Sequence, residues 1–268
     1  MPELPEVENT RRYLEEAGLV GSVFTGVSVG WANAFRLPGL EDFVLSLPGS
    51  RVEAVQRRAK YLLLPLNTGN TLILHLGMAG GLLIQPKSSP PHSMVRNAFA
   101  LTNDQEMRFI DPRKFGKIWL AENVATVLPP LGPDPLSEGF TVEALAKSLG
   151  KRNIPIKPLL LEQSIAAGVG NLYADESLYL AGIHPLRLAS DLSKEEIPHL
   201  RDSIVKVLTS AVASYDRRRA EAPLESPLKL VTWTIPRSAG APCARCGNPI
   251  SMTTVRGRTT FFCTKCQH

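Results

Sequence analysis

The spacing of apolar residues changes twice along the chain and divides it into regions of different predicted structure. Residues 5–18 carry Val7, Leu14 and Ala17 near one face of a helical repeat, and Gly18 follows as a stop signal. From about residue 20 to 125 the pattern is typical of strands, and beyond about residue 137 it becomes helical again. The pattern therefore predicts an N-terminal helix, a β-rich region and a helical region.

Two hairpins are predicted within the β-rich region. Residues 61–64 and 71–74 are apolar and flank a turn sequence at 67–70. Residues 97–101 and 107–110 flank a second turn at 103–105. A Pro/Ser loop lies between the hairpins, and the strands together predict two sheets packed face to face.

The helical region begins after a proline-rich linker at residues 128–137. Helices are expected at 141–149 and 158–165, and a third begins with Asn171 as its cap and ends at Gly182. Ser193 and Glu196 form a capping-box pattern that opens a fourth helix, which reaches about residue 215.

The predicted fold class is α+β with several domains. The expected divisions are 1–127 for an N-terminal β-sandwich domain with its leading helix, 128–137 for the linker, 138–222 for the helical domain, 223–236 for a short loop and 237–268 for a cysteine-rich hairpin.

Charge favours a polyanionic partner. The 268 residues have a net charge of +5 and a pI near 9.1. From Arg237 onward there are five Lys or Arg and no Asp or Glu. No apolar run approaches the roughly 18 residues of a membrane span, and the acidic start lacks a signal-peptide core. We therefore expect no membrane partner, a protein that is not secreted, and a monomer.

All four cysteines lie in two Cys-x-x-Cys pairs that are separated by sixteen residues. Cys243 with Cys246 and Cys263 with Cys266 predict one closed, structural zinc site in a reducing compartment. Disulfide pairing is the alternative. Residues 253–262 between the pairs predict a hairpin that presents Arg256 and Arg258, either to phosphates or only to solvent.

The first residues carry candidate covalent chemistry. If Met1 is removed, Pro2 becomes a secondary amine, and an α-amino group titrates near pH ~8. An amine beside the carboxylate of Glu3 is suited to iminium formation with a sugar carbon, the carboxylate moving protons. The alternative is that Pro2, Pro5 and the acidic residues only start a helix.

Three further motifs have both a structural and a functional interpretation. Residues 168–171, with Lys157 upstream, form a turn or an anion site. Residues 56–60 concentrate three positive charges before an apolar strand. Met78, Arg113 and Phe115 lie on predicted loops, where they are core and turn residues or a set that separates a base from its duplex.

Taken together, these stretches resemble the formamidopyrimidine-DNA glycosylase and endonuclease VIII family, in its zinc-finger-containing, purine-directed branch. The matches run from Met1 to Cys266 in the family's order. The resemblance implies a β-sandwich, a helix-two-turn-helix domain and a zinc finger that bind damaged double-stranded DNA. It also implies a bacterial, cytoplasmic and nucleoid-associated repair enzyme with glycosylase and lyase activities, one structural Zn²⁺ and no small-molecule cofactor.

The resemblance also implies roles for individual residues. Pro2 matches the nucleophile that leads to β and δ elimination, Glu3 the catalytic carboxylate and Glu6 a supporting one. The remaining matches are Lys60, Gly170, Asn171 and Arg258 as phosphate-binding positions, Lys157 as a lysine near the lesion, Met78 and Phe115 as void fillers, and Arg113 as the reader of the opposite cytosine.

One stretch departs from the family pattern. Purine-directed members carry a longer, Gly-rich loop before the zinc finger, whereas residues 217–236 are short and Pro-rich. This stretch cannot form the same lid, which argues against a preference for 8-oxoguanine. The expected main substrates are formamidopyrimidines, with 8-oxoguanine as a second candidate and oxidised pyrimidines, bulkier lesions or abasic sites as alternatives. A non-catalytic sensor of damaged DNA and a zinc ribbon that binds RNA or protein are the competing functions.

Overall fold

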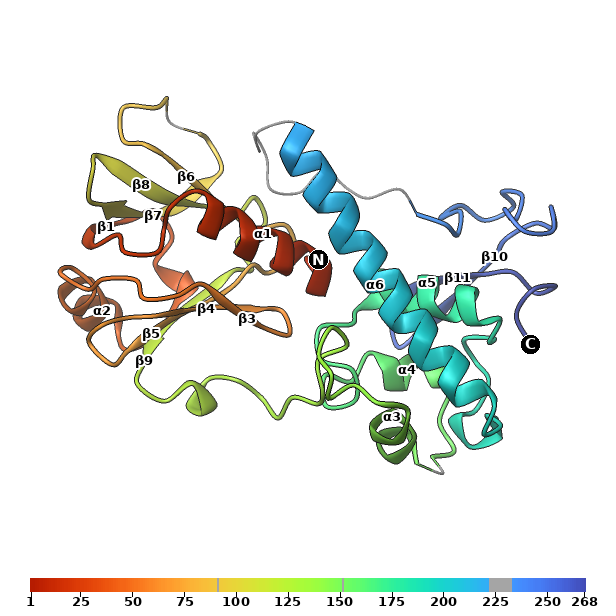
Figure 1. Cartoon of the computed structure of the whole chain (residues 1–268). Helices are drawn as coiled ribbons and strands as arrows, with labels where there is room; N and C mark the ends of the chain where they lie inside the picture. Colours follow the sequence, from red (N-terminus) through yellow and green to blue (C-terminus); the bar gives the residue numbers. More distant parts are fainter. Residues whose placement is uncertain (91, 151, 222–232) are drawn as a thin grey trace. The chain divides into compact units, whose positions relative to one another are not determined.

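A computed structural model describes residues 1–90, 92–150, 152–221 and 233–268, which form two compact units (Figure 1). Of these, residues up to 129 together with 215–221 belong to unit 1, and the rest belong to unit 2. The α+β class predicted from the sequence is confirmed. Across the described ranges, no helix is long and apolar enough to cross a membrane.

Unit 1 contains two sheets, with strand orders β1-β7-β8-β6 and β2-β9-β5-β4-β3 (Figure 1). Its elements are α1 (Leu4–Glu16), β1 (Phe24–Val29), η1 (Ala32–Ala34), β2 (Phe35–Leu37), α2 (Leu40–Ser46), β3 (Gln56–Arg58), β4 (Tyr61–Pro65), β5 (Thr71–His75), β6 (Gly81–Pro86), β7 (Val95–Leu101), β8 (Gln105–Ile110), β9 (Lys117–Ala121) and η2 (Val124–Thr126).

The two sheets share one apolar core, as the alternation of side chains along each strand requires. Leu62 and Leu64 of β4 pack in the same cluster as Phe99 of β7 and Phe109 of β8. Leu63, between the two leucines, points to a second cluster on the other face. The predicted β-sandwich is therefore confirmed, and α1 contributes Val7 and Leu14 to its core.

Both predicted hairpins form. β4 pairs antiparallel with β5, and β7 pairs antiparallel with β8. The second turn is shorter than expected, because Gln105 already belongs to β8. Asn103 and Asp104 adopt φ values of 61° and 57°, a left-handed geometry that Asn and Asp tolerate better than most residues.

Unit 2 is mainly helical and ends in a short hairpin. Its elements are α3 (Val142–Leu149), α4 (Ile156–Leu160), α5 (Asn171–Ala181), η3 (Ala189–Asp191), the first part of α6 (Glu196–Glu221), β10 (Ser251–Val255) and β11 (Arg258–Phe262). The capping box that opens α6 is present, because the Glu196 carboxylate accepts a hydrogen bond from Ser193 N and the Ser193 hydroxyl accepts one from Glu196 N.

Three helix predictions need correction. α4 spans 156–160 and not 158–165, because Pro158 is accepted within a first helical turn and the chain turns after Leu161. Gly170, not Asn171, is the N-cap of α5. α6 extends to Glu221, so residues 217–221 of the expected loop are helical. The rest of that loop, from 222 to 232, lies outside the described residues.

Candidate functional site

Glu3 and Glu6 form a reciprocal cap at the start of α1, directly after Pro2. The Glu3 side chain accepts a hydrogen bond from the Glu6 backbone, and Glu6 Oε2 accepts one from Glu3 N at 2.8 Å. Pro5 suits the first helical turn, because the backbone N–H that a proline lacks would have no intrahelical acceptor there. Glu3 and Glu6 are only 2% and 4% exposed, so two carboxylates are buried beside Pro2.

Met1 lines a pocket of about 270 Å³ in unit 1 together with Met78 and Phe115. Both of these apolar side chains are exposed, Met78 by 36% and Phe115 by 54%. The guanidinium carbon of Arg113 lies 5.4 Å from the centre of the Phe115 ring. Met1, Met78 and Phe115 thus share one pocket. Arg113, the third predicted base-displacing residue, stacks on the Phe115 ring.

Two glycines bring the Met78 and Phe115 loops together. A Cβ on Gly77 would lie 2.6 Å from the Gly116 nitrogen, and one on Gly116 would lie 2.3 Å from the Phe109 ring. Asp111 directly follows β8, at the start of the loop that carries Arg113. Its buried carboxylate accepts hydrogen bonds from the backbone nitrogens of Lys114 and Gly116, at 3.0 and 2.7 Å, and so shapes the loop that carries Arg113.

His75 lines this pocket, as does Lys117. Burial lowers its pKa to about 4, and the charges of Lys60 and Lys117 contribute. Its Nδ1 accepts a hydrogen bond from Gly77 N at 3.2 Å, as a neutral imidazole can. Lys60 itself is 7% exposed. The imidazole is therefore neutral, and the two lysines are the charged groups that act on it.

The predicted cluster at residues 56–60 does not act as one charged surface. Arg57 is buried, and its Nε donates to Glu8 Oε2 at 2.9 Å. Burial raises the pKa of Glu8, but hydrogen bonds from Arg11, Arg12 and Arg57 outweigh it and bring the pKa below its usual range. Arg57 therefore holds β3 against α1 and does not contribute to an exposed charged surface.

In unit 2, Gln163 holds the turn at residues 168–170. Its Nε2 donates to the carbonyls of Leu161 and Val169, and its Oε1 accepts from Gly168 N at 2.9 Å. Sequence reasoning missed this residue, because its contacts with the turn become visible only in the structure. Gly170 then caps α5 with an extended backbone. The Asn171 side chain donates to Thr259 O in β11 at 2.9 Å, so it joins α5 to the hairpin.

Lys157 is fully buried. Its Nζ lies 2.6 Å from Asp175 Oδ1 and 2.6 Å from Thr260 Oγ1. Asp175 Oδ2 in turn accepts hydrogen bonds from Arg237 Nη2 and from Phe261 N. Lys157 therefore joins α4 to α5 and to the hairpin formed by β10 and β11. Its place near a lesion stays a prediction from the resemblance.

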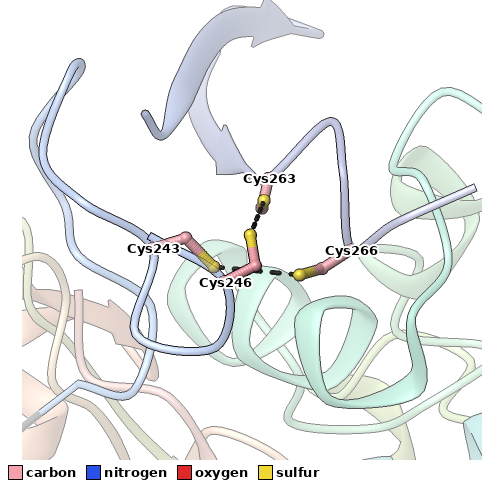
Figure 2. Close-up of side chains that lie close together, drawn as sticks. All are labelled: Cys243, Cys246, Cys263 and Cys266. Carbon is pink, nitrogen blue, oxygen red and sulfur yellow. Dashed lines mark hydrogen bonds between the residues drawn. The ribbon is translucent and has the colours of Figure 1, made fainter. Parts of the chain in front are cut away.

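The four cysteines converge in unit 2 (Figure 2). Their sulfur atoms lie within 4.8 Å of one another, with 3.9 Å between Cys243 and Cys266 and 3.6 Å between Cys246 and Cys263. These separations exclude disulfides, whose sulfurs are about 2.05 Å apart. Tetrahedral zinc with bonds of about 2.3 Å places its sulfurs about 3.8 Å apart, so the cysteines fit one structural zinc ion.

The zinc hairpin has a basic tip. β10 pairs with β11, and the turn between them contains Arg256 and Gly257, both with positive φ. Arg258 is exposed at the start of β11. Arg256 is also exposed and lies 3.5 Å from Glu162 in an ion pair. Of the two predicted arginines, Arg258 is therefore the better placed for a phosphate.

The predicted site residues fall in both units. Those in unit 1 are Pro2, Glu3, Glu6, Lys60, Met78, Arg113 and Phe115, and those in unit 2 are Lys157, Gly170, Asn171, Arg258 and the four cysteines. Tyr215, a unit 1 residue that sequence reasoning missed, donates its hydroxyl to Glu6 Oε1 at 2.9 Å.

Comparison with known proteins identifies the family. Residues 1–118 match the formamidopyrimidine-DNA glycosylase N-terminal domain, 131–219 its H2TH domain and 240–268 the zinc finger found in FPG and IleRS. A formamidopyrimidine-DNA glycosylase of Herpetosiphon aurantiacus is 42% identical over the full length of both chains. The Lactococcus lactis enzyme, bound non-covalently to DNA with an AP site, has a TM-score of 0.86 and 33% identity, and the match covers 99% of each chain. MutM in complex with DNA that contains carbocyclic 8-oxo-G has a TM-score of 0.87 at 33% identity, again over 99% of each chain. The chain therefore belongs to the formamidopyrimidine-DNA glycosylase family.

Proposed function

We propose that this protein is a DNA glycosylase and abasic-site lyase that removes oxidised bases from duplex DNA. One observation carries the proposal: Pro2 is followed by two buried, mutually capped carboxylates, and Met1 lines a pocket with Met78 and Phe115. The DNA-bound relatives support the same conclusion, since one was bound to AP-site DNA and the other to an 8-oxo-G analogue. The protein acts as a monomer and associates with the bacterial nucleoid.

The chemistry begins when removal of Met1 frees the Pro2 amine. Its lone pair forms a bond to the sugar C1′ while the bond from C1′ to the damaged base breaks, and the base leaves with the electron pair and takes up a proton. Glu3 moves the proton that opens the sugar ring at O4′, which gives an iminium. Loss of a C2′ proton then expels the 3′ phosphate, and loss of a C4′ proton expels the 5′ phosphate. Water hydrolyses the remaining iminium, which releases the sugar remnant and restores the Pro2 amine.

DNA is held by residues from both units. Lys60, Asn171 and Arg258 contact phosphates, as does the Gly170 backbone amide at the start of α5. Met78 and Phe115 fill the space left by the displaced base, and Arg113 hydrogen-bonds the opposite cytosine. Lys157 contributes through the buried ion pair that holds β11 in place.

Formamidopyrimidines are the proposed main substrates and 8-oxoguanine a second one. Residues 217–221 are helical, so they do not begin a Gly-rich loop that could fold over a base. A formamidopyrimidine has an opened ring and tolerates a less enclosed pocket. A less enclosed pocket would also admit oxidised pyrimidines and bulky lesions, which are the alternative substrates.

The test is a panel of end-labelled duplexes that contain a formamidopyrimidine, 8-oxoguanine, an oxidised pyrimidine or an abasic site. The wild-type protein should release the base and cut the strand at a formamidopyrimidine. Glu3→Gln should abolish base release while DNA binding is retained. Glu41→Gln is the control, because Glu41 lies at the start of α2 as Glu3 lies at the start of α1, but Glu41 is exposed. Full base release by Glu3→Gln would refute the role of this carboxylate.

A further inference from the structure

The end of α6 packs on α1 within unit 1. From Tyr215 onward the helix belongs to unit 1, and three of its side chains contact α1. Tyr215 donates to Glu6, Asp216 accepts from Arg12 at 2.5 Å, and Arg219 donates to Asn9 at 2.5 Å and to Glu16 at 2.7 and 3.0 Å. The last residues of α6, of which the sequence assigned Arg219 to a loop, therefore contact the helix that carries Glu6 and follows Pro2 and Glu3.

The contact made by Tyr215 differs from those made by Asp216 and Arg219, because Tyr215 donates to a buried carboxylate, that of Glu6. It is 4% exposed, whereas the side chains of Asp216 and Glu16 are 33% and 58% exposed. Burial and the adjacent Glu6 carboxylate raise the pKa of Tyr215 far above its usual value. The hydroxyl consequently remains a hydrogen-bond donor throughout the physiological pH range.

Glu6 connects Tyr215 to the start of the chain. Its Oε1 accepts from Tyr215 and its Oε2 accepts from the backbone nitrogen of Glu3, the residue that follows Pro2. A carboxylate fixed at both oxygens cannot rotate, so the Glu3 backbone is held at a defined position. Without the tyrosine hydroxyl, one oxygen of a carboxylate that is 4% exposed would lose this partner.

We propose that Tyr215 is a positioning residue for the N-terminal nucleophile: through Glu6 it holds the Glu3 backbone and thereby the Pro2 nitrogen beside the sugar carbon. This inference rests on the proposed function for its effect on rate, but the contact chain itself can be tested without catalysis. The position of the amine, to within a fraction of an ångström, strongly affects the rate of its attack on a bound substrate, because it determines how often the reacting atoms are aligned.

Tyr215→Phe removes the hydroxyl and keeps the ring. We expect the single-turnover rate of iminium formation to fall about tenfold, the scale of a lost hydrogen bond to a charged group, with unchanged affinity for a duplex carrying a tetrahydrofuran abasic analogue. Tyr13→Phe is the matched control, because its hydroxyl also ties α1 to a neighbour but bonds the Ile84 backbone. It should leave the rate unchanged.

A double-mutant comparison separates positioning from general stabilisation. If Tyr215 acts through Glu6, then Glu6→Gln with Tyr215→Phe should be no slower than Glu6→Gln alone. A double variant that is slower by the product of the two single effects would overturn the inference. So would a Tyr215→Phe rate equal to that of the wild type.

Amide hydrogen exchange tests the contact chain independently of activity. Tyr215→Phe should speed exchange of the Glu3 N–H about tenfold, because its acceptor is then less fixed. The Val7 N–H donates to Glu3 O at 3.1 Å and serves as the internal control. Unchanged Glu3 exchange would overturn the inference. Faster exchange in a protein whose wild type forms no iminium would uphold the contact and refute the proposed function.

Discussion

Lys157 Nζ and Asp175 Oδ1 lie 2.6 Å apart, and both side chains are fully buried. The pair joins α4 to α5, and Thr260 and Arg237 extend it to the zinc hairpin and the segment before it. Removing Lys157 takes away the cation at Asp175 Oδ1, so this fully buried oxygen loses its ion pair while Arg237 still contacts Oδ2. The loss of a buried pair is far more costly than the loss of an exposed one.

We therefore predict that Lys157→Met lowers the free energy of unfolding of unit 2 by about 3 kcal/mol. Arg152→Met is the control, since Arg152 pairs with Glu162 at 3.1 Å but the two side chains are 45% and 31% exposed. Its cost should be below about 1 kcal/mol. Urea unfolding of the zinc-loaded variants measures both. Equal costs would contradict the role assigned to Lys157.

The neutral His75 predicts a loss of stability in mild acid. Its pKa is lowered to about 4 in the folded protein, by burial and by Lys60 and Lys117, against about 6.5 in the unfolded chain. Between these values the unfolded state binds more protons, so stability is fully present above pH ~6.5 and declines as the pH falls toward 4.

Replacing His75 should reduce this decline. His75→Gln should show a smaller drop in urea midpoint between pH 7 and pH 5 than the wild type does, whereas His92→Gln, in an exposed loop, should not. Carboxylates and His184 also contribute to the pH dependence of stability, and burial lowers the pKa of His184 as well. The contribution of His75 is therefore obtained by comparing variants. Identical pH dependences for the wild type and His75→Gln would contradict a neutral, buried imidazole.

Zinc removal should affect DNA binding more than the β-sandwich. Cys246→Ser removes one of the four ligands, so the ion should be lost and the hairpin should unfold. We expect affinity for the tetrahydrofuran duplex to fall at least tenfold, because Arg258 is then no longer held in place. Met252→Ser, an exposed β10 side chain, should keep both zinc and affinity. Zinc content by elemental analysis and binding by anisotropy provide the comparison.

Arg258 and Arg113 should have different effects on DNA recognition. Arg258→Ala should weaken binding to every sequence and reduce the slope of log Kd against log salt by about one unit, as expected for one lost phosphate contact. Arg113→Ala should instead relax the preference for cytosine opposite the lesion. Salt titrations on duplexes with each opposite base measure both effects. Equal losses for all four bases in both variants would show that the assignment is wrong.

Local patterns predicted the features that depend on neighbouring residues. The hairpins, the capping box at Ser193 and Glu196, and the cysteine pairs each lie within a short stretch whose spacing determines the structure. The end of α6 was missed because residues 217–236 were interpreted together as one short, Pro-rich loop. Arginine and alanine favour helices, and Arg219 gains partners on α1 that the local sequence does not show.

Contacts between distant residues were not predictable from one sequence. Tyr215 and Glu6 are 209 positions apart, and Lys157 and Thr260 are 103 apart. Lysine is seldom fully buried without a partner, so an exposed role was the natural expectation for Lys157. Only the fold shows that Asp175 lies opposite it.

Borohydride trapping with mapping of the adduct tests the central claim most directly. The purified protein, with loss of Met1 confirmed by intact mass, is reduced on a duplex that contains an abasic site and is then digested. We predict that the sugar remnant lies on the Pro2 nitrogen, and that Pro5→Ala, which keeps this amine, traps equally well. An adduct on a lysine such as Lys60, or no adduct although the DNA is bound, would contradict the account.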